Sequence, residues 1–202
     1  PVVPRTMPIP SDAQLREQAD ALGERLRATR DHLVTAESCT GGWIAKSLTD
    51  IAGSSDWFDC GMVVYSYEAK QGLLGVRPQT LEEHGAVSRE TAIEMVSGAL
   101  VHSGASVAVA VTGIAGPGGG SPDKPVGTVW IAWKRRGGYA RAQVFHFDGD
   151  REAAQAGEAV PMRPTAEEVG TLTGPPSIDG VAAAKSEIVS GLVPTGTAVL
   201  NA

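Results

Sequence analysis

Ser106-Val-Ala-Val-Ala-Val-Thr112 is the most apolar strand-like segment of this chain. A strand with one wet face alternates apolar and polar residues, whereas this run is continuously apolar, so we expect a central strand that is covered on both faces. A glycine- and proline-rich segment, 113–127 (the glycine loop), separates it from a second apolar run, Thr128-Val-Trp-Ile-Ala-Trp133. The Gly137-Gly138 pair then predicts a hairpin turn that leads to a return strand over 140–147.

Upstream of the central strand, helical and strand patterns follow one another. Ser11 is a good helix N-cap, and apolar residues recur on one face of the segment after it. The predicted helices cover 11–28, 43–50, 66–74, a segment that begins at Pro78, and 88–102; the predicted strands cover 32–36 and 61–65. Helices interleaved with strands and followed by a hairpin are typical of a three-layer α/β/α domain with a mixed, largely parallel central sheet.

The composition is that of an ordinary globular protein. The 202 residues suffice for one domain, or one domain and an extension, and 42% hydrophobic with 20% charged residues permit a real core. A net charge of -6 argues against nucleic acid as a partner. We interpret the densest basic cluster, Lys134-Arg135-Arg136, as a solvated strand end. No apolar run approaches the roughly 20 residues that span a bilayer, which argues against a membrane partner.

The two ends of the chain differ from the middle. Residues 1–10 carry prolines where a signal peptide would be apolar, and we interpret them as an N-terminal arm. Residues 153–202 hold five prolines and no aromatic residue, which predicts a loosely packed or disordered tail after a domain of 11–152. Cys39 and Cys60 form neither a disulfide framework nor metal-ligand spacing. We therefore expect a cytoplasmic protein without a metal or a cofactor.

The segment Thr35-Ala-Glu-Ser-Cys-Thr-Gly-Gly42 places a small polar cluster between a strand and a helix. Residues 38–42 of it form what we call the serine loop. Such an element presents side chains at the carboxyl edge of the sheet, where open α/β folds bind ligands. We expect the N–H groups of Thr40, Gly41 and Gly42 to face an oxyanion there. The alternative is that Ser38 or Thr40 only caps the helix, and the segment alone favours that alternative.

The identity of a nucleophile stays open on these residues. Cys39 is the better nucleophile once ionised, yet a cysteine hydrolase normally needs a histidine, and none of the four histidines stands near another catalytic residue type. A serine without histidine can use a lysine as its base. Lys70 qualifies if the strand that ends at Tyr65 lies beside the strand before Ser38, although its pKa would have to fall to about 7–8. Spacing alone favours an exposed surface lysine.

The glycine loop opens at the same sheet edge, because it follows the central strand after Thr112. Successive glycines can turn their N–H groups inward to form a nest for a phosphate. The loop matches neither a dinucleotide-binding fingerprint nor a P-loop. An anion nest that begins at Gly113 and a flexible or ordinary glycine-rich loop are equally compatible with the spacing.

Taken together, these segments resemble the competence-damage-inducible CinA C-terminal family, and the similarity runs in order from about residue 11 to 151. The matching motifs are Ala36-Glu-Ser-Cys-Thr-Gly-Gly42, Ile51-Ala-Gly-Ser-Ser55, Tyr65-Ser-Tyr-Glu-Ala-Lys70, His84-Gly-Ala-Val-Ser88, Thr112-Gly-Ile-Ala-Gly-Pro117 and Lys124-Pro-Val-Gly-Thr-Val129. The family includes stand-alone nicotinamide-nucleotide amidohydrolases of the PncC type. The resemblance implies deamidation of nicotinamide mononucleotide to nicotinate mononucleotide and ammonia in pyridine-nucleotide salvage.

The resemblance also implies roles for individual residues. It implies Ser38 as nucleophile with Lys70 and Tyr65 as partners, and it places Thr112 and Arg151 at further active-site positions. With the amides of the serine loop and Gly113, these residues make up the expected substrate site. The expected partners are a small nucleotide substrate and further copies of the chain in a homo-oligomer. A non-catalytic nucleotide-binding module of the same family, or a hydrolase of another small amide, are the alternatives.

Overall fold

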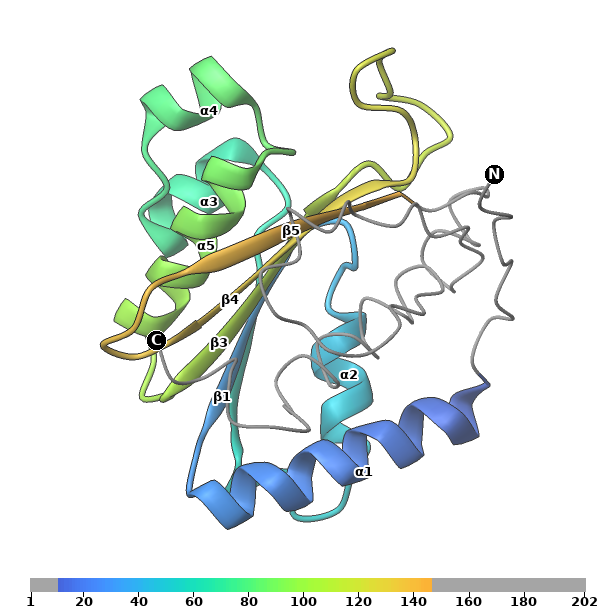
Figure 1. Ribbon diagram of the computed structural model, residues 1–202, viewed down its shortest axis with the longest axis vertical. Helices are drawn as coiled ribbons and strands as arrows, with labels where there is room; N and C mark the ends of the chain where they lie inside the picture. The colour runs from blue at the N-terminus through green and yellow to red at the C-terminus, as the bar shows by residue number, and fades with distance from the viewer. Residues whose placement is uncertain (1–10, 147–202) are drawn as a thin grey trace, which may run out of the picture.

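The computed structural model describes residues 11–146, which form a sheet between two layers of helices (Figure 1). The elements in chain order are α1 (Asp12–Thr29), β1 (Leu33–Glu37), α2 (Trp43–Thr49), the short 3-10 helix η1 (Ser54–Asp56), β2 (Phe58–Val63), α3 (Tyr67–Leu74), α4 (Pro78–His84), α5 (Arg89–Val101), β3 (Val107–Gly113), β4 (Thr128–Arg135) and β5 (Arg141–His146). The predicted arm at 1–10 and tail at 153–202 lie outside the described residues.

The sheet has the strand order β2-β1-β3-β4-β5, so the apolar run that predicted a central strand is the middle strand. β1 pairs in parallel with both β2 and β3, whereas β4 pairs antiparallel with β3 and β5. Four strands therefore share one direction, but only half of the four pairings are parallel. The predicted fold class, a three-layer α/β/α domain with a mixed sheet, is confirmed.

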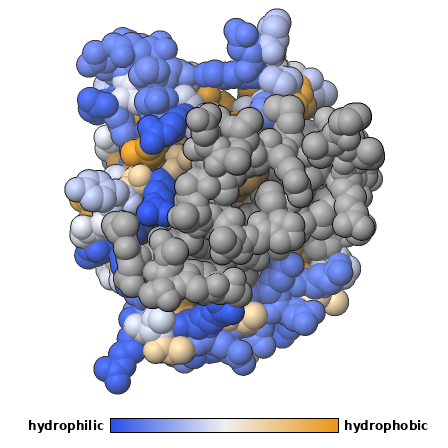
Figure 2. All heavy atoms as spheres, viewed as in Figure 1, coloured by the Kyte–Doolittle hydropathy of each residue, from blue (hydrophilic) through white to orange (hydrophobic). Residues whose placement is uncertain are grey.

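Both faces of β3 are buried because each carries its own core. Val107, Val109 and Val111 belong to the core beneath α1 and α2. Ala108 and Ala110 belong to the core beneath α3, α4 and α5, where their small side chains let α5 pack close to the sheet. The outer surfaces of α4 and α1 are hydrophilic, as expected for amphipathic helices that cover a core (Figure 2).

Helix α3, which carries Lys70, is seated by an unusually close contact with α5. A Cβ atom at Gly98 of α5 would lie 1.8 Å from the carbonyl oxygen of Leu74, the last residue of α3. Only a glycine allows this approach, because a side chain there would push the helix away. The contact fixes how far α3 stands from the sheet, and so fixes the reach of Lys70 toward β1.

The boundaries of β2 differ from the prediction. The sequence predicted a strand over 61–65, but β2 runs from Phe58 to Val63. It is an edge strand whose residues alternate between half-buried and exposed, so the continuous apolar run at its end is a poor guide to where it begins. At its other end, the carbonyl oxygens of Val64 and Tyr65 accept hydrogen bonds from Lys70 rather than from a neighbouring strand.

The interpretation of Lys134-Arg135-Arg136 as a solvated strand end is only partly correct: β4 ends at Arg135 and Arg136 is exposed, but both arginines have specific partners. Arg135 makes two hydrogen bonds to the buried carboxylate of Asp31, at 2.8 and 2.5 Å. Arg136 donates to three main-chain carbonyl groups, those of Leu100, Ser103 and Ala105. The basic cluster therefore ties β4 to the segments at the edge of the sheet opposite Ser38. Within residues 11–146, none of the helices is long and apolar enough to cross a membrane.

Candidate active site

Ser38 lies at the carboxyl edge of the parallel strands, one residue beyond β1. Its N–H group donates to the carbonyl oxygen of Val111 in β3 at 3.0 Å, so the residue is held in line with the sheet. Successive residues of a strand point to opposite faces. Glu37 accordingly faces α2, and Ser38 faces α3 on the other side. This alternation delivers the Ser38 hydroxyl to the helix that carries Lys70.

Lys70 is completely buried and contacts Ser38 directly, which excludes the interpretation as an exposed surface lysine. Its Nζ lies 2.9 Å from Ser38 Oγ, 2.8 Å from the carbonyl oxygen of Val64 and 3.2 Å from that of Tyr65. No carboxylate forms an ion pair with it among the described residues. Burial without a counter-charge disfavours the ammonium form and lowers the pKa of Lys70 below its ordinary value.

The three contacts of Lys70 suit a neutral amine that acts as a base. A neutral amine has two N–H groups and one lone pair. The carbonyls of Val64 and Tyr65 accept two N–H bonds, and the remaining direction points at Ser38 Oγ. When Lys70 loses its proton, the lone pair therefore faces the hydroxyl whose proton it has to accept.

Tyr65 reaches this pair through its main chain. Its carbonyl oxygen accepts the hydrogen bond from Lys70, while the residue itself is 62% exposed. The side chain of Tyr65 is therefore at the surface, and the contact of this residue with Lys70 is through its main chain. The proton-relay role of its hydroxyl stays a prediction.

Cys39, the competing nucleophile, points away from Lys70 into the core beneath α1 and α2, with only 5% of its surface exposed. Burial raises the pKa of its thiol to about 12, and the negative charge of Glu37 opposes the thiolate further. The thiolate is the nucleophilic form of cysteine, so this side chain is inert near neutral pH. Among the side chains of the serine loop, the hydroxyl of Ser38 is the one that contacts Lys70.

Glu37 is a site residue that the sequence analysis missed. Its carboxylate is fully buried and accepts hydrogen bonds from the N–H groups of Gly42 at 3.1 Å, Ile44 at 3.1 Å and Ala45 at 2.7 Å. The hydroxyl of Thr40 adds a bond of 2.6 Å. The carboxylate therefore fills the N-terminus of α2, where the helix dipole favours a negative charge. A glutamate at the last position of a buried strand, just before a glycine-led helix, is the signal that could have revealed it.

The amides that were expected to hold an oxyanion already have acceptors in this structure. The N–H group of Gly42 donates to Glu37, and that of Gly41 donates to the carbonyl oxygen of Ser38 at 3.1 Å. The N–H group of Thr40 lies against the Cys39 sulfur, where it favours the thiolate. These amides stabilise the shape of the serine loop in the resting state. To bind an oxyanion they would first have to exchange these acceptors.

Thr112 and Gly113 lie at the same sheet edge as Ser38. Thr112 is buried, and its hydroxyl donates to the carbonyl oxygen of Ala86, in the turn between α4 and α5, at 2.7 Å. The N–H group of Ala86 in turn donates to the Tyr67 hydroxyl at 3.3 Å. Thr112 thus positions this turn beside the site. Gly113 lies so close to β4 that an added Cβ would approach Val129 Cγ2 to 2.7 Å.

The glycine loop folds back on itself and packs on Val126. A Cβ at Gly116 would lie 2.5 Å from Val126 Cγ1, and one at Gly120 would lie 2.8 Å from the Val126 nitrogen. The glycines therefore permit a close approach within the loop, which is the reason many loops require glycine. These contacts account for Gly116 and Gly120 as residues of an ordinary glycine-rich loop, without an anion nest. Arg151, the remaining predicted site residue, lies outside the described residues.

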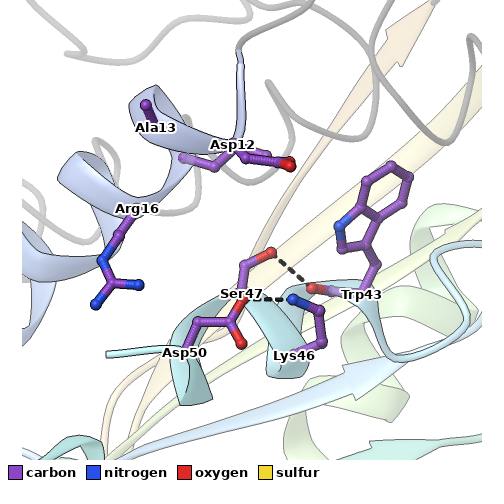
Figure 3. A pocket seen from close by; sticks show the side chains of 8 residues that line it. Asp12, Ala13, Arg16, Trp43, Lys46, Ser47 and Asp50 are labelled. Carbon is purple, nitrogen blue, oxygen red and sulfur yellow. Dashed lines mark hydrogen bonds and ion pairs between the residues drawn. The ribbon is translucent and has the colours of Figure 1, made fainter. Parts of the chain in front are cut away.

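A cavity of about 230 Å³ lies between α1 and α2, on the opposite face of the sheet from Lys70 (Figure 3). It is lined by Asp12, Ala13, Leu15, Arg16, Trp43, Lys46, Ser47 and Asp50. Lys46 is paired with Asp50, and the hydroxyl of Ser47 donates to the carbonyl oxygen of Trp43. None of the predicted site residues lines this cavity, so we place the candidate site at Ser38 and Lys70. Across 11–146, no three His, Cys, Asp or Glu side chains gather as a metal site would require.

Residues 15–160 match the model of the CinA C-terminal domain. The chain belongs to the CinA C-terminal domain family. The nicotinamide-nucleotide amidohydrolase PncC of Escherichia coli K12 is 50% identical over 145 residues, which cover 72% of this chain and 88% of that protein. A CinA-like protein of Geotalea daltonii is 57% identical over 120 residues, covering 59% of this chain and 29% of that protein.

Solved structures agree with this membership. The competence/damage inducible protein CihA of Agrobacterium tumefaciens superposes with a TM-score of 0.67 and 48% sequence identity, over 72% of this chain and 87% of that one. At this identity and TM-score the two chains share the fold.

Proposed function

We propose that this chain is a nicotinamide-nucleotide amidohydrolase that converts nicotinamide mononucleotide to nicotinate mononucleotide and ammonia. The observation that carries the proposal is the buried 2.9 Å contact between Ser38 Oγ and Lys70 Nζ, a nucleophile and a base without a histidine. The similarity to PncC of Escherichia coli supports the substrate class. The substrate is a small nucleotide, and the function belongs to pyridine-nucleotide salvage.

The reaction begins when neutral Lys70 accepts the hydroxyl proton of Ser38. The Ser38 oxygen then attacks the carboxamide carbon, and the carbonyl π electrons move to the oxygen to give a tetrahedral oxyanion. Collapse of this intermediate breaks the C–N bond. The leaving nitrogen takes a proton, which the Tyr65 hydroxyl relays from the Lys70 ammonium, and departs as ammonia. Water, with Lys70 as base again, hydrolyses the acyl ester and releases the carboxylate.

The environment of Lys70 makes this base available near neutral pH. Burial lowers its pKa, so the neutral form is populated at a lower pH than for an exposed lysine. General-base catalysis is efficient when the pKa of the base lies near the working pH. The buried position, rather than the spacing in the sequence, is therefore what turns Lys70 into a base.

The experiment that tests the proposal is ammonia release from nicotinamide mononucleotide by the purified chain. We expect the Ser38→Ala variant to lose the activity and the Cys39→Ala variant to retain most of it, because Cys39 faces the core. A dead Cys39→Ala variant beside an active Ser38→Ala variant would reverse the assignment. A panel of pyridine amides with and without ribose phosphate separates this substrate from other small amides, and no ammonia from any of them would indicate a binding module.

Two finer expectations accompany this function. We expect a homo-oligomer, which light scattering of the purified protein tests. We also expect a cytoplasmic location, as the composition and the cysteine pattern predicted, and cell fractionation tests it.

A further inference from the structure

The proposed substrate carries a phosphate dianion, and neither the N-terminus of α2 nor the close-packed glycines of the glycine loop offers it an evident site. Helix N-termini bind phosphates through free N–H groups. At α2 these groups hold the carboxylate of Glu37, which would repel a second anion. In the glycine loop, Gly116 and Gly120 are packed against Val126, so these two glycines serve a close approach within the loop. The phosphate therefore needs a cation elsewhere at this edge.

The ammonium of Lys70 is not free to bind a phosphate. All three directions around its Nζ end on partners, namely Ser38 Oγ and two main-chain carbonyl oxygens. A lysine ammonium has three donors, and the hydrogen bonds of Lys70 use all of them. Moreover, a phosphate beside Lys70 would stabilise the ammonium form and raise its pKa, which would remove the base that Ser38 needs.

Lys124 is a cation that the structure holds in place at the same edge. The main-chain N–H and carbonyl groups of Lys124 and Ser121 bond to each other reciprocally, at 2.9 and 3.1 Å, so the backbone of Lys124 is fixed in a tight turn. The Ser121 hydroxyl accepts a further bond from the Lys124 N–H group at 3.2 Å. The half-buried side chain then crosses to α4, where Nζ donates to the carbonyl oxygen of His84 at 2.8 Å.

The ammonium of Lys124 is joined to the catalytic edge through the turn between α4 and α5. His84 lies two residues before Ala86, and the carbonyl oxygen of Ala86 accepts the Thr112 hydroxyl. Thr112 follows Val111, whose carbonyl oxygen accepts the N–H group of Ser38. Figure 1 shows the glycine loop and α4 standing beyond the same end of the sheet. Lys124 therefore connects the glycine loop to the end of α4, two segments that lie beyond the sheet edge at which Ser38 is found.

We propose that Lys124 binds the phosphate of the nucleotide substrate and so selects nucleotides over phosphate-free amides. This inference rests on the proposed function. One N–H of the ammonium bonds to His84, and two remain for phosphate oxygens. Lysine binds phosphate as a point charge and does not need a bidentate geometry.

Other cations of the described residues are less suited to this role. Lys46 is paired with Asp50 and Arg77 with Glu94, while Arg135 binds Asp31 at the opposite edge. Arg89, at the start of α5, is exposed and serves as the natural competitor in a test.

The test compares ammonia release from nicotinamide mononucleotide and from nicotinamide riboside, the same amide without the phosphate. For Lys124→Met we expect KM for the mononucleotide to rise on the order of 10–100-fold, the usual scale for a lost charge-assisted contact, with little change in kcat. Riboside kinetics should stay at the wild-type level. Lys124→Arg should keep most of the affinity, and Lys46→Met is the matched control because that lysine lies on the far face.

Two outcomes would overturn the role of Lys124, and a third would overturn the proposed function instead. If Lys124→Met impairs both substrates equally, the side chain only latches the glycine loop to α4. If Arg89→Met or Arg151→Met shows the phosphate-dependent loss while Lys124→Met does not, another cation binds the phosphate. If wild type releases no ammonia from either substrate, the proposed function has failed. Calorimetric binding of the mononucleotide to wild type and Lys124→Met then still tests Lys124 itself.

Discussion

The serine loop and the glycine loop leave the same edge of the sheet and are both rich in glycine, yet they are stabilised in different ways. In the serine loop, the backbone N–H group of Gly42 and those at the start of α2 converge on the buried carboxylate of Glu37. In the glycine loop, Gly116 and Gly120 make room for Val126. One loop is organised by charge and the other by packing, so glycine content alone identifies neither an anion nest nor a lid.

The difference matters for where the chemistry lies. The serine loop has a fixed shape and presents Ser38 to Lys70. The glycine loop instead carries Lys124, whose side chain binds the end of α4. A reacting group has to be held within a fraction of an ångström, since a misplacement of about 1 Å can cost about 10²-fold in rate. We therefore expect changes in the serine loop and its base to affect catalysis, and changes in the glycine loop to affect stability and binding.

The largest expected effect comes from removing the base. Lys70→Arg keeps a positive charge but cannot deprotonate, so it should lose on the order of 10²–10⁴ in kcat/KM. In wild type, kcat/KM should rise with pH as Lys70 becomes neutral. Because burial lowers the pKa of Lys70, this rise should occur at a lower pH than an ordinary lysine would give. The measurement is kcat/KM against pH for both proteins. Near-normal activity of Lys70→Arg with an unchanged basic limb would remove Lys70 from the mechanism.

The second expected effect concerns the carboxylate that organises the serine loop. Glu37→Gln keeps the shape of the side chain but replaces one acceptor oxygen with an NH₂ group that faces N–H donors. We expect a loss of about 2–3 kcal/mol in the free energy of unfolding, the scale of hydrogen bonds to a charged group. We also expect kcat to fall by up to about 10²-fold at nearly constant KM.

A pH profile separates positioning by Glu37 from a general loss of structure. Glu37 does not contact Lys70, so the midpoint of the profile should stay where it is in wild type. Glu94→Gln is the control, since that carboxylate binds Arg77 and Thr80 on the surface of α4 and α5. Full kcat in Glu37→Gln would show that the serine loop does not need the charge.

The elements of the fold could largely be predicted from the sequence because their signals are local. The capping box of Ser11 and Gln14, the helix start at Pro78 and the unbroken apolar run of β3 each depend on neighbours within one turn or one strand. The carboxyl end of β2 could not be predicted, because it depends on Lys70, which binds the carbonyls of Val64 and Tyr65 just beyond the strand.

The site could be predicted only in part, for the same reason. Spacing placed Lys70 on a short surface helix, and its burial depends on the close contact between Gly98 and Leu74, two residues distant in sequence. The resemblance to a family selected Lys70 where spacing did not. Neither the spacing nor the resemblance identified Glu37. In the sequence, a glutamate beside a serine and a cysteine is typical of a polar loop, and only the alternation of side chains along β1 places it beneath α2.

A third effect tests the packing of the glycine loop with two glycines from the same segment. A Cβ at Gly120 would meet the main chain of Val126, whereas one at Gly118 would have nothing within 4 Å. Gly120→Ala should therefore destabilise the protein by about 1–3 kcal/mol, the usual scale of overpacking. Gly118→Ala should be neutral or slightly stabilising, because it restricts the unfolded chain. Urea unfolding of both variants is the measurement, and equal effects would contradict a packed loop.

The smallest expected effect concerns Gly41, a glycine of the serine loop that can be compared with Gly120 of the glycine loop. Gly41 has a φ of 61°, in the left-handed region, and an added Cβ would have nothing within 4 Å. A glycine is therefore favoured at position 41 by the backbone conformation and not by a lack of space for a side chain. Gly41→Ala should cost about 1–2 kcal/mol in unfolding free energy, the usual penalty of a side chain in this region. Gly41→Asn should cost less, because asparagine tolerates left-handed geometry better than most residues.

The order of these two variants is the result that matters, because it separates conformation from contact. If backbone conformation alone determines the cost, Gly41→Asn is more stable than Gly41→Ala although its side chain is larger. If Gly41 instead has to leave space for a neighbouring group, the larger asparagine is the worse of the two. Urea unfolding of both variants gives the order, and kcat measured on the same samples shows whether Ser38 stays in place. Retained kcat in Gly41→Asn would mean that the serine loop needs the left-handed turn at this position and not glycine itself.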